Sequence, residues 1–149
     1  MEDKWYCHRG FLKAWKHIEP YIKDEIMDPT VKKVMIVGFS QGAAVATFAY
    51  EYVWFNRPDL RDSLEGYGFG CPRVFWGRLK DSLAERWSNF HPIINKHDIV
   101  THLPPKYFGF RHVGDPIYVD SKTKGWKFWL DAHSWSNYET GIRNAIDNE

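Results

Sequence analysis

The first strong pattern in the chain is an amphipathic segment near its beginning. Apolar residues recur there at steps of three and four, which places them on one face of a helix. The residues that form this face are Phe11, Trp15, Ile18, Ile22 and Ile26. We expect the face to pack against a sheet. We also expect Pro20 to kink the helix or divide it, because proline lacks the N–H group that a helix interior uses.

The next segment passes directly from a strand into a helix. Val34 to Val37 is a continuous apolar run, typical of a strand that is covered on both faces, so residues 33–39 are predicted to form a central strand. Residues 41–55 follow, and they are apolar on nearly all sides, with alanine, valine and phenylalanine at most positions from 43 to 49. A helix of this kind is buried.

Strands and helices continue to alternate along the chain. Residues 65–70 and 90–95 are predicted strands, and a helix between them is marked by apolar residues at helical spacing. Those residues are Trp76, Leu79, Leu83 and Trp87. This strand–helix–strand order predicts an α/β fold, built on a mostly parallel sheet with helices on both faces.

The last part of the chain is predicted to hold two short strands and a helix. Residues 117–119 and 126–130 are the predicted strands, joined as a hairpin by residues 121–125. A closing helix is marked by Trp135, Tyr138, Ile142 and Ala145. The chain has 149 residues and no linker or internal repeat, so we expect one domain over residues 1–149.

Charge and composition argue against several classes of function. The formal net charge is +1, so no overall excess of basic residues points to nucleic acid. The chain has no run of about 18 apolar residues, and no integral membrane segment is expected. Cys7 and Cys71 lack a second cysteine or a histidine at metal-ligand spacing. We therefore expect no zinc or haem site, and neither a metal nor a cofactor.

Two features of the sequence favour a cytoplasmic location. The start of the chain has no apolar core of the kind that a signal peptide carries. Two isolated cysteines do not make a disulfide framework, although one disulfide between them stays open. We therefore expect a cytoplasmic protein in a reducing compartment.

Residues 38–42, Gly-Phe-Ser-Gln-Gly, lie where the predicted central strand meets the buried helix. A serine on such a sharp turn projects its hydroxyl above the sheet, and glycine on either side lets the backbone fold tightly. This is the pattern of the nucleophile elbow in serine hydrolases. The alternative is a glycine-rich turn that only lets the strand and the helix pack closely. We favour Ser40 as a nucleophile.

A serine nucleophile needs a histidine to take its proton and a carboxylate to orient that histidine. In folds with such an elbow, the acid and then the histidine follow the serine, with the acid just after a later strand. Asp98 occupies that place, and a turn cap is its alternative role. The histidines that come next are His102, His112 and His133. We favour His133, because the start of the last helix can reach back over the sheet.

At these motifs the sequence resembles the class 3 lipases, a family of fungal-type triacylglycerol lipases with the α/β-hydrolase fold. The similar segments are His8–Leu12, Gly38–Gly42, Gly70–Val74, Asn95–Pro105, Gly109–Gly114 and Asp131–Tyr138. They follow one another in the family's order from about residue 8 to residue 142. That order is more specific than any one motif.

The resemblance implies a reaction as well as a fold. It implies a serine carboxylic ester hydrolase that cleaves acylglycerols or other lipid esters through an acyl-enzyme. In this reaction Ser40 would be the nucleophile, His133 the base and then the acid, and Asp98 the orienting carboxylate. The backbone N–H of Gln41 would be one oxyanion donor. His112 matches a histidine that is not catalytic in the family.

The remaining histidines and Cys71 are expected to lie outside the chemistry. His8 is predicted to be structural, and His97 and His102 are predicted to be solvated loop residues. Cys71 has no base near it in the sequence, so we expect a buried small apolar residue and not a nucleophile.

The resemblance also implies that the family's domain has a part that precedes residue 8. Members carry there a strand, an oxyanion loop and a lid helix, and seven residues are too few to hold them. We therefore expect a shortened lipase-like α/β-hydrolase domain over residues 1–149. The strand edge at Val34–Val37 would then be open. Residues 2–8, a second copy of the chain or a separately encoded partner would cover it, and a homo-oligomer is expected.

Three functions stay open from the sequence. The first is a serine esterase or lipase with slow turnover, since one oxyanion donor is missing. Without a lid, soluble short- or medium-chain esters are expected to be better substrates than emulsified fat. The second is a catalytically impaired lipase-like module that binds or regulates, or one part of a longer or two-chain enzyme. The third is transfer of the acyl group to an alcohol other than water.

Overall fold

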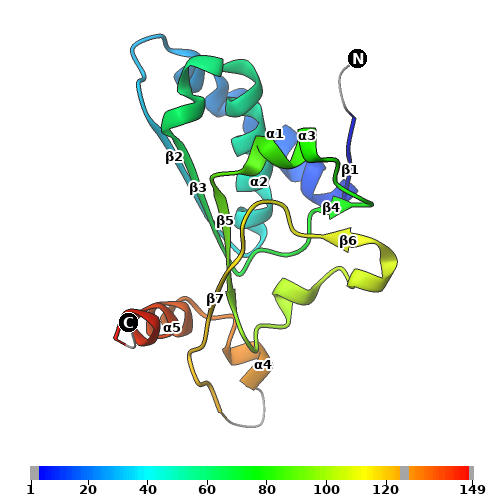
Figure 1. Ribbon diagram of the computed structural model, residues 1–149, viewed down its shortest axis with the longest axis vertical. Helices are drawn as coiled ribbons and strands as arrows, with labels where there is room; N and C mark the ends of the chain where they lie inside the picture. Colours follow the sequence, from blue (N-terminus) through cyan, green and yellow to red (C-terminus); the bar gives the residue numbers. More distant parts are fainter. Residues whose placement is uncertain (1–3, 125–127, 148–149) are drawn as a thin grey trace.

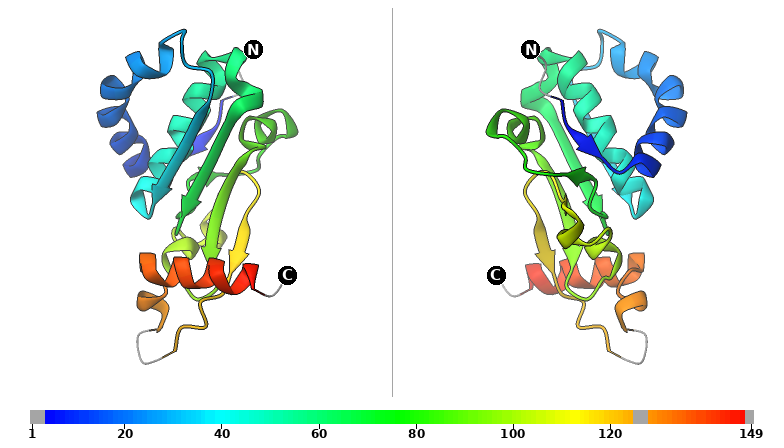
Figure 2. Two further views of the ribbon diagram at one scale, coloured as in Figure 1. Left: turned by 90° about the vertical axis from the view of Figure 1, so that its left-hand side faces the viewer. Right: turned by 90° about the vertical axis from the view of Figure 1, so that its right-hand side faces the viewer.

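The computed structural model describes residues 4–124 and 128–147. A four-stranded sheet in the order β2–β3–β5–β7 runs through the molecule (Figures 1 and 2). Its strands are β2 (Val34–Phe39), β3 (Leu64–Phe69), β5 (Phe90–Asn95) and β7 (Ile117–Val119). All neighbouring pairs are parallel, and helices lie on both faces. The predicted α/β fold is confirmed.

β2 lies at the edge of the sheet and not at its centre. Its side chains alternate between half-buried and exposed positions, and Met35 and Val37 are 55% and 56% exposed. The prediction of a central strand covered on both faces is therefore wrong for the residues that the structure describes. A continuous apolar run shows that both faces of a strand are apolar, but it does not show what covers them.

Two helices cover opposite faces of the sheet (Figure 1). α2 (Gln41–Asn56) packs on one face, and its side chains between residues 46 and 53 join Leu64 and Phe90 in the largest core cluster. α5 (Trp135–Ile146) crosses the other face, where Tyr138 packs with Ile93 and Val119. The buried helix after Ser40 and the closing helix are both confirmed.

α1 (Arg9–Met27) is a single helix that runs through Pro20. Pro20 is exposed, so water can satisfy the carbonyl that the proline leaves without a donor, and the helix is not divided. The apolar face of α1 packs mainly on α2, where Trp15 joins Ala44 and Phe48 in a second core cluster. α1 therefore packs on the neighbouring helix more than on the sheet, which differs from the expected packing against the sheet.

The helix predicted from Trp76 to Trp87 is present only in its second half. α3 (Asp81–Ala84) and the 3-10 helix η2 (Glu85–Trp87) bury Leu83 and Trp87. Trp76 belongs instead to a strand and is 46% exposed. Gly77 separates the two parts with a backbone φ of 100°, a conformation outside the helical region.

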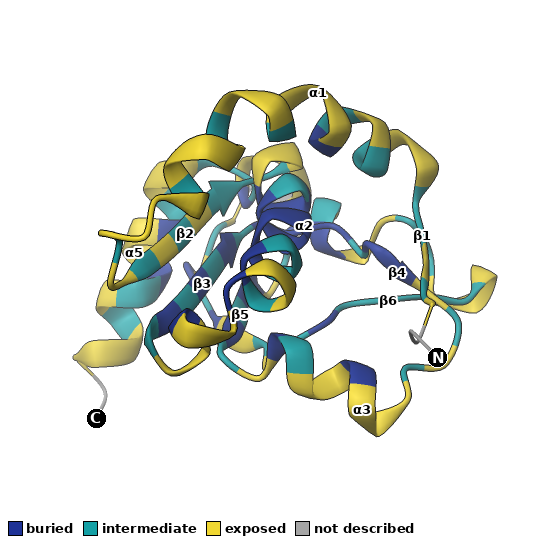
Figure 3. Ribbon diagram, turned by 90° about the horizontal axis from the view of Figure 1, so that it is seen from above, coloured by how far each residue is buried: buried dark blue, intermediate teal, exposed yellow. Residues whose placement is uncertain are grey.

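A second, smaller sheet lies beside α2 (Figure 3). It contains β1 (Tyr6–Cys7), β4 (Phe75–Trp76) and β6 (Phe110–Arg111), paired antiparallel in the order β1–β4–β6. Tyr6 and Cys7 therefore do not cover the edge of β2, which was one expectation for residues 2–8. Residues 2 and 3 of that segment lie outside the described residues.

The described residues after β7 do not form the predicted hairpin. β7 confirms the strand at residues 117–119, but its partner is β5, in parallel pairing. Residues 128–131 of the next predicted strand form a short helix, α4 (Phe128–Asp131). Gly125, Trp126 and Lys127, which belong to the predicted loop and strand, lie outside the described residues. Three further 3-10 helices lie in the described part of the chain: η1 (Pro58–Ser63), η3 (Val100–His102) and η4 (Lys106–Phe108).

Three expectations concern membranes, metals and cysteines. No helix in the described part of the chain is both long and apolar enough to cross a membrane. In the same part, no three His, Cys, Asp or Glu side chains are grouped so that they could hold a metal ion. Cys7 and Cys71 are free, so the disulfide left open by the sequence is not formed. Cys71 is buried, as expected, and burial raises its pKa to about 12.

His112 ties the end of β6 to η3. Its Nε2 lies 2.9 Å from the carbonyl O of Thr101, so the N–H of Nε2 donates to that oxygen. Its Nδ1 is buried and has no hydrogen-bond partner among the described residues. Burial lowers the pKa of His112 from its ordinary 6.5 to about 4, because the charged imidazolium would lose its hydration.

The free energy of unfolding is therefore expected to fall as the pH drops from about 6.5 to about 4. In this window the unfolded chain binds a proton at His112 that the folded chain does not bind. The loss should approach about 2 kcal/mol between pH ~6.5 and pH ~4.5. Chemical denaturation of the wild type and of His112→Gln at both pH values measures it, since glutamine keeps a donor for Thr101 and does not titrate. An equal loss in both proteins would show that His112 is not the cause.

Candidate active site

Ser40 lies on the turn that joins β2 to α2. Its backbone has φ 57° and ψ −124°, which is unusual for a residue with a side chain. The turn is held because the N–H of Ser40 donates to the carbonyl O of Phe69, at the end of β3, over 2.8 Å. Strain of this kind persists only where the surrounding structure holds it, and it clusters at active sites.

Glycine makes room on only one side of this turn. A Cβ at Gly38 would lie 2.3 Å from the carbonyl O of Gly42 and 2.7 Å from the N of Ala43. With any other residue at position 38, β2 and the first turn of α2 could not approach so closely. A Cβ at Gly42 would meet nothing within 4 Å. Steric crowding therefore requires glycine at position 38 but not at position 42, where glycine was also expected to be needed.

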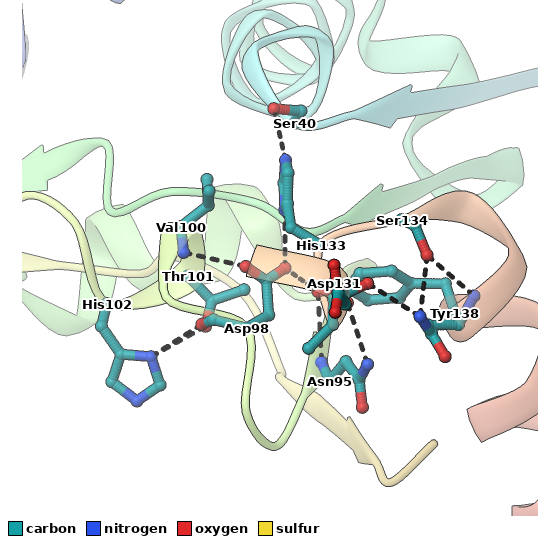
Figure 4. A network of polar contacts seen from close by, with 12 residues as sticks. Ser40, Asn95, Asp98, Val100, Thr101, His102, Asp131, His133, Ser134 and Tyr138 are labelled. Carbon is teal, nitrogen blue, oxygen red and sulfur yellow. Dashed lines mark hydrogen bonds and ion pairs between the residues drawn. The ribbon is translucent and has the colours of Figure 1, made fainter. Parts of the chain in front are cut away.

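His133 bridges Ser40 and Asp98 (Figure 4). Its Nε2 lies 2.8 Å from the Oγ of Ser40, and its Nδ1 lies 2.8 Å from the Oδ2 of Asp98. With the proton on Nδ1, the ring donates to Asp98 and accepts from the hydroxyl of Ser40. The ring also stacks on Phe39, with centroids 5.0 Å apart. The structure thus brings together the three residues favoured from the sequence.

Asp98 is fully buried and accepts three hydrogen bonds. Its Oδ2 accepts from His133 and, over 2.5 Å, from the hydroxyl of Tyr138. Its Oδ1 accepts from the N–H of Val100 over 2.8 Å. A buried carboxylate is costly unless donors of this kind replace water. The bond to Val100 is a turn cap, so Asp98 makes the contact of the alternative role as well.

Tyr138 and Asn95 form a second layer behind Asp98 (Figure 4). The hydroxyl of Tyr138 donates to Asp98 and accepts from the N–H of Asn95 over 3.2 Å. Burial, and then the bond to Asp98, raise the pKa of Tyr138 well above its ordinary value, so the phenol remains a donor. The side-chain amide of Asn95 donates to the carbonyl O of Ala132, beside His133, over 3.0 Å. These contacts tie the Asp98 loop to the His133 loop.

Tyr138 and Asn95 are site residues that were not predicted from the sequence. The pattern places Tyr138 on the apolar face of the closing helix and Asn95 at the end of a strand. The usable signals are a phenol within an apolar face and an amide at the carboxyl end of a parallel strand, where site residues gather. Neither signal says which group the polar atom meets.

Gly70 leaves the space in which His133 and Asp98 meet. It follows β3 with a backbone φ of 60°. A Cβ there would lie 2.9 Å from the Cε1 of His133 and 3.2 Å from the Oδ2 of Asp98. A side chain at this position would therefore be strained in its backbone and would displace the histidine ring.

His102 and His112 bond to backbone carbonyls and not to the hydroxyl of Ser40. His102 is exposed, as expected, and its Nδ1 lies 3.0 Å from the backbone carbonyl O of Asp98. His97 is half-buried, which differs from the expected solvated loop position. His112 is bonded to the backbone of Thr101, within η3.

A cleft of about 360 Å³ opens beside the hydroxyl of Ser40. Its lining consists of His8, Phe11, Ser40, Gln41, Pro72, Val100, Leu103 and Pro104. Most of these side chains are apolar, which suits a hydrocarbon chain. His8, which was expected to be structural, forms part of this wall.

The first residue of α2 also faces this cleft. The N–H of Gln41 is among the first four in the helix, which have no acceptor within the helix itself. A backbone N–H in that position can donate to a negatively charged oxygen beside Ser40. The site thus combines an acceptor for the serine proton, a donor for an oxyanion and an apolar cleft.

Comparison with known proteins gives a family. The family model described as Lipase (class 3) matches residues 1–108. A secreted mono- and diacylglycerol lipase of Malassezia globosa is 32% identical over 132 residues, which cover 80% of this chain and 40% of that protein. A secreted mono- and diacylglycerol lipase of Fusarium solani is 32% identical over 118 residues, which cover 76% of this chain and 34% of that protein.

A solved structure supports the same fold. It is a triacylglycerol lipase whose catalytic centre is described as a serine protease triad. It matches with a TM-score of 0.65 and 27% sequence identity, and the match covers 79% of this chain and 46% of that chain. The chain therefore spans about a third to a half of the length of these relatives.

The relatives contradict the cytoplasmic location expected from the sequence. The proteins of Malassezia globosa and Fusarium solani are both secreted lipases, which points to an extracellular location. The expectation relied on two cysteines and on the first residues of the chain. Two free thiols are compatible with a reducing or an oxidising compartment, so they do not indicate a cytoplasmic location.

The family match covers most of the chain, and the fold and the serine turn agree with it. Residues 1–108 include β2, the turn at Ser40, α2 and Asp98. The chain belongs to the class 3 lipase family.

Proposed function

We propose that the chain hydrolyses carboxylic esters of lipids, acylglycerols among them, through an acyl-enzyme on Ser40. The observation that carries the proposal is the pair of 2.8 Å contacts that join Ser40 to His133 and His133 to Asp98. Both distances lie in the range over which a proton can be transferred or a ring held in one orientation. Family membership and the apolar cleft support the same substrate class.

In the first half of the reaction, the Oγ of Ser40 attacks the ester carbonyl carbon while the Nε2 of His133 takes the hydroxyl proton. The carbonyl oxygen becomes an oxyanion, and the N–H of Gln41 donates to it. His133 then gives its proton to the leaving alcohol, and the acyl group remains on Ser40. Asp98 orients the ring and stabilises the imidazolium from the Nδ1 side.

In the second half, His133 removes a proton from water, and the resulting hydroxide attacks the acyl carbonyl carbon. The second tetrahedral intermediate collapses when His133 returns the proton to the Oγ of Ser40, which releases the carboxylic acid. An alcohol in place of water would give acyl transfer by the same steps. Analysis of products in the presence of an added alcohol separates the two reactions.

We also infer that residues 1–149 form one lipase-like domain. The ring of Trp5 supports this, because it packs against both of the larger core clusters. It stacks on Phe48 and Phe75 and meets the edge of Trp87, so the segment before α1 shares its core with α2 and η2. We further propose an extracellular location, as in the secreted relatives.

We expect a fluorophosphonate to label the wild type once, at Ser40, because only a hydroxyl with a base beside it attacks such a probe at an appreciable rate. Ser40→Ala should not be labelled, and His133→Ala should react at least about a hundredfold more slowly. Ser88→Ala, at an exposed turn, is the matched control and should label like the wild type. Intact mass gives the stoichiometry.

Absence of an adduct on the wild type would instead favour the impaired lipase-like binding module. Labelling of Ser40→Ala at the wild-type rate would show that another nucleophile reacts. Hydrolysis of soluble esters and of acylglycerols by the same variants then shows which esters the site accepts.

Tyr138→Phe is expected to lower kcat about tenfold with little change in KM, because Asp98 loses its 2.5 Å donor while the ring still fills its place. Rates of ester hydrolysis across a range of pH, together with the free energy of unfolding, measure the effect. A positioning role predicts an altered pH profile in a protein that is still folded. Tyr52→Phe on α2 is the matched control. A wild-type profile for Tyr138→Phe would rule out this role.

We also propose that a second copy of the chain covers the open edge of β2. The exposed apolar side chains of Met35 and Val37, next to unpaired backbone groups on an edge strand, support the need for a cover. Sedimentation velocity should therefore show a dimer or larger species, and Val37→Lys should shift it towards the monomer. A single sharp monomer peak for the wild type would refute the homo-oligomer.

A further inference from the structure

A closed set of hydrogen bonds surrounds the segment that carries His133. Its members are four polar side chains from separate parts of the chain: Asn95, Ser121, Thr123 and Asn137. Asn95 ends β5, Ser121 and Thr123 follow β7, and Asn137 lies in the first turn of α5. These four side chains are termed the polar clamp.

The clamp begins at Asn95, whose side chain is fully buried. Its Nδ2 donates to the carbonyl O of Ala132 over 3.0 Å and to the Oγ of Ser121 over 2.9 Å. Its Oδ1 accepts from the backbone N–H of Ser121 over 3.1 Å. Both amide N–H groups and the amide oxygen are therefore used. A buried amide that is satisfied in this way is fixed in one orientation.

The bonds of the clamp run in one direction. Thr123 donates its only hydroxyl proton to the Oδ1 of Asn137 over 3.1 Å. The hydrogen bond between the hydroxyls of Ser121 and Thr123 must then use the proton of Ser121. Each hydroxyl thus accepts one bond and donates the next. Hydrogen bonds in such an order polarise and strengthen one another.

Asn137 returns the clamp to the segment where it began. Its Nδ2 donates to the carbonyl O of Asp131 over 2.8 Å and to the Oγ of Ser134 over 2.9 Å. Asn95 holds the carbonyl O of Ala132 from the other end of the clamp. Bonds from both ends therefore meet on the same four consecutive residues, 131–134.

His133 lies within this segment. Figure 4 shows Asn95 and Asp131 on the side of His133 away from Ser40. The ring of His133 is held by Asp98, through its Nδ1. The backbone that carries the ring is held by the clamp, from both sides of the histidine.

The turn that links Ser121 to Thr123 is strained. Lys122 has a backbone φ of 54°, a conformation that is uncommon for a residue with a side chain. Its N–H donates to the Oδ1 of Asp120 over 2.7 Å, which holds the turn. The turn brings the two hydroxyls of the clamp within reach of each other. Backbone strain of this kind persists only where the surrounding structure holds it.

We propose that the polar clamp positions His133 for proton transfer, with Thr123 and Asn137 as positioning residues. Asp98 orients the ring, but the 2.8 Å contact between Nε2 and the Oγ of Ser40 also depends on where the backbone of His133 lies. A displacement of about 1 Å at such a contact can cost about a hundredfold in rate. The effect on hydrolysis rests on the proposed function, whereas the effect on the position of His133 does not.

Thr123→Val breaks the clamp at its middle and keeps the size and branching of the side chain. We expect kcat for a soluble ester to fall about tenfold with little change in KM, because the clamp acts through His133 and not on the substrate. Thr123→Ser keeps the hydroxyl and should restore most of the rate. Thr140→Val on α5 is the matched control, since it also removes a hydroxyl hydrogen bond, to the carbonyl O of Ser136. It should keep the wild-type rate.

Asn137→Asp separates positioning from a purely structural role. A carboxylate in the first turn of a helix favours the helix, but here it replaces both donors of the amide by an acceptor. We expect kcat to fall about tenfold in a protein that chemical denaturation shows to be folded. Ser136→Asp adds the same charge at an exposed position of the same turn and should keep the wild-type rate. Thr123→Val with Asn137→Asp should be no slower than the slower single variant, because the clamp acts as one unit.

Proton NMR tests the position of His133 without catalysis. The proton that the Nδ1 of His133 donates to Asp98 is expected to give a downfield resonance. The wild type and Thr140→Val should share this resonance, and Thr123→Val and Asn137→Asp should shift or broaden it. A clamp that only stabilises the fold would leave the resonance and kcat unchanged in every variant that is folded.

Two results would overturn the proposal. The first is a wild-type kcat and a wild-type resonance in both Thr123→Val and Asn137→Asp. The second is a loss of kcat in these variants that follows only the loss of folded protein. If the wild type hydrolyses no ester but its resonance responds to the clamp variants and not to Thr140→Val, the proposed reaction is refuted and the positioning of His133 by the clamp is supported.

Discussion

A buried carboxylate needs donors from several directions, and Asp98 receives them from three separate parts of the chain. The N–H of Val100 comes from its own loop, the imidazole of His133 from the segment before α5, and the phenol of Tyr138 from α5 itself. Because leaving Asp98 buried without these donors would be costly, the carboxylate holds the end of β5 against α5. The position of His133 over Ser40 follows from this arrangement.

Close backbone approach is the second requirement of the site. Gly38 allows β2 and α2 to meet at the serine turn, and Gly70 leaves the volume that the histidine ring occupies. Ser40 keeps its unusual backbone because β3 accepts its N–H and α2 begins at once. Packing therefore stores the strain that points the hydroxyl towards His133. The same packing explains why the large apolar helix α2 lies at the centre of the molecule.

Outside the core, several large apolar and aromatic side chains remain exposed on the surface. The small sheet β1–β4–β6 exposes the rings of Tyr6 and Trp76, whose centroids lie 5.9 Å apart. Met35 and Val37 expose a separate apolar patch on β2. The first of these surfaces depends on the assembled sheet, since Tyr6 and Trp76 come from segments tens of residues apart. The polar groups of the internal site thus have hydrogen-bond partners, whereas large apolar side chains remain exposed on the surface.

Local pattern was enough to determine the parallel sheet, the buried helix after Ser40 and the identity of the three residues that meet at the site. Each of these depends on short-range chemistry: apolar runs at the right period, a glycine-flanked serine turn, and polar residues at strand ends. The edge position of β2, the role of Trp76 in β4 and the parallel pairing of β7 depended on which segments meet in space. Tyr138 gives the clearest case, because its periodicity marks only a buried helix face, and its hydroxyl has a role only where α5 crosses the end of β5. The tertiary structure decided these points because strand order and buried polar contacts are set by neighbours distant in the sequence.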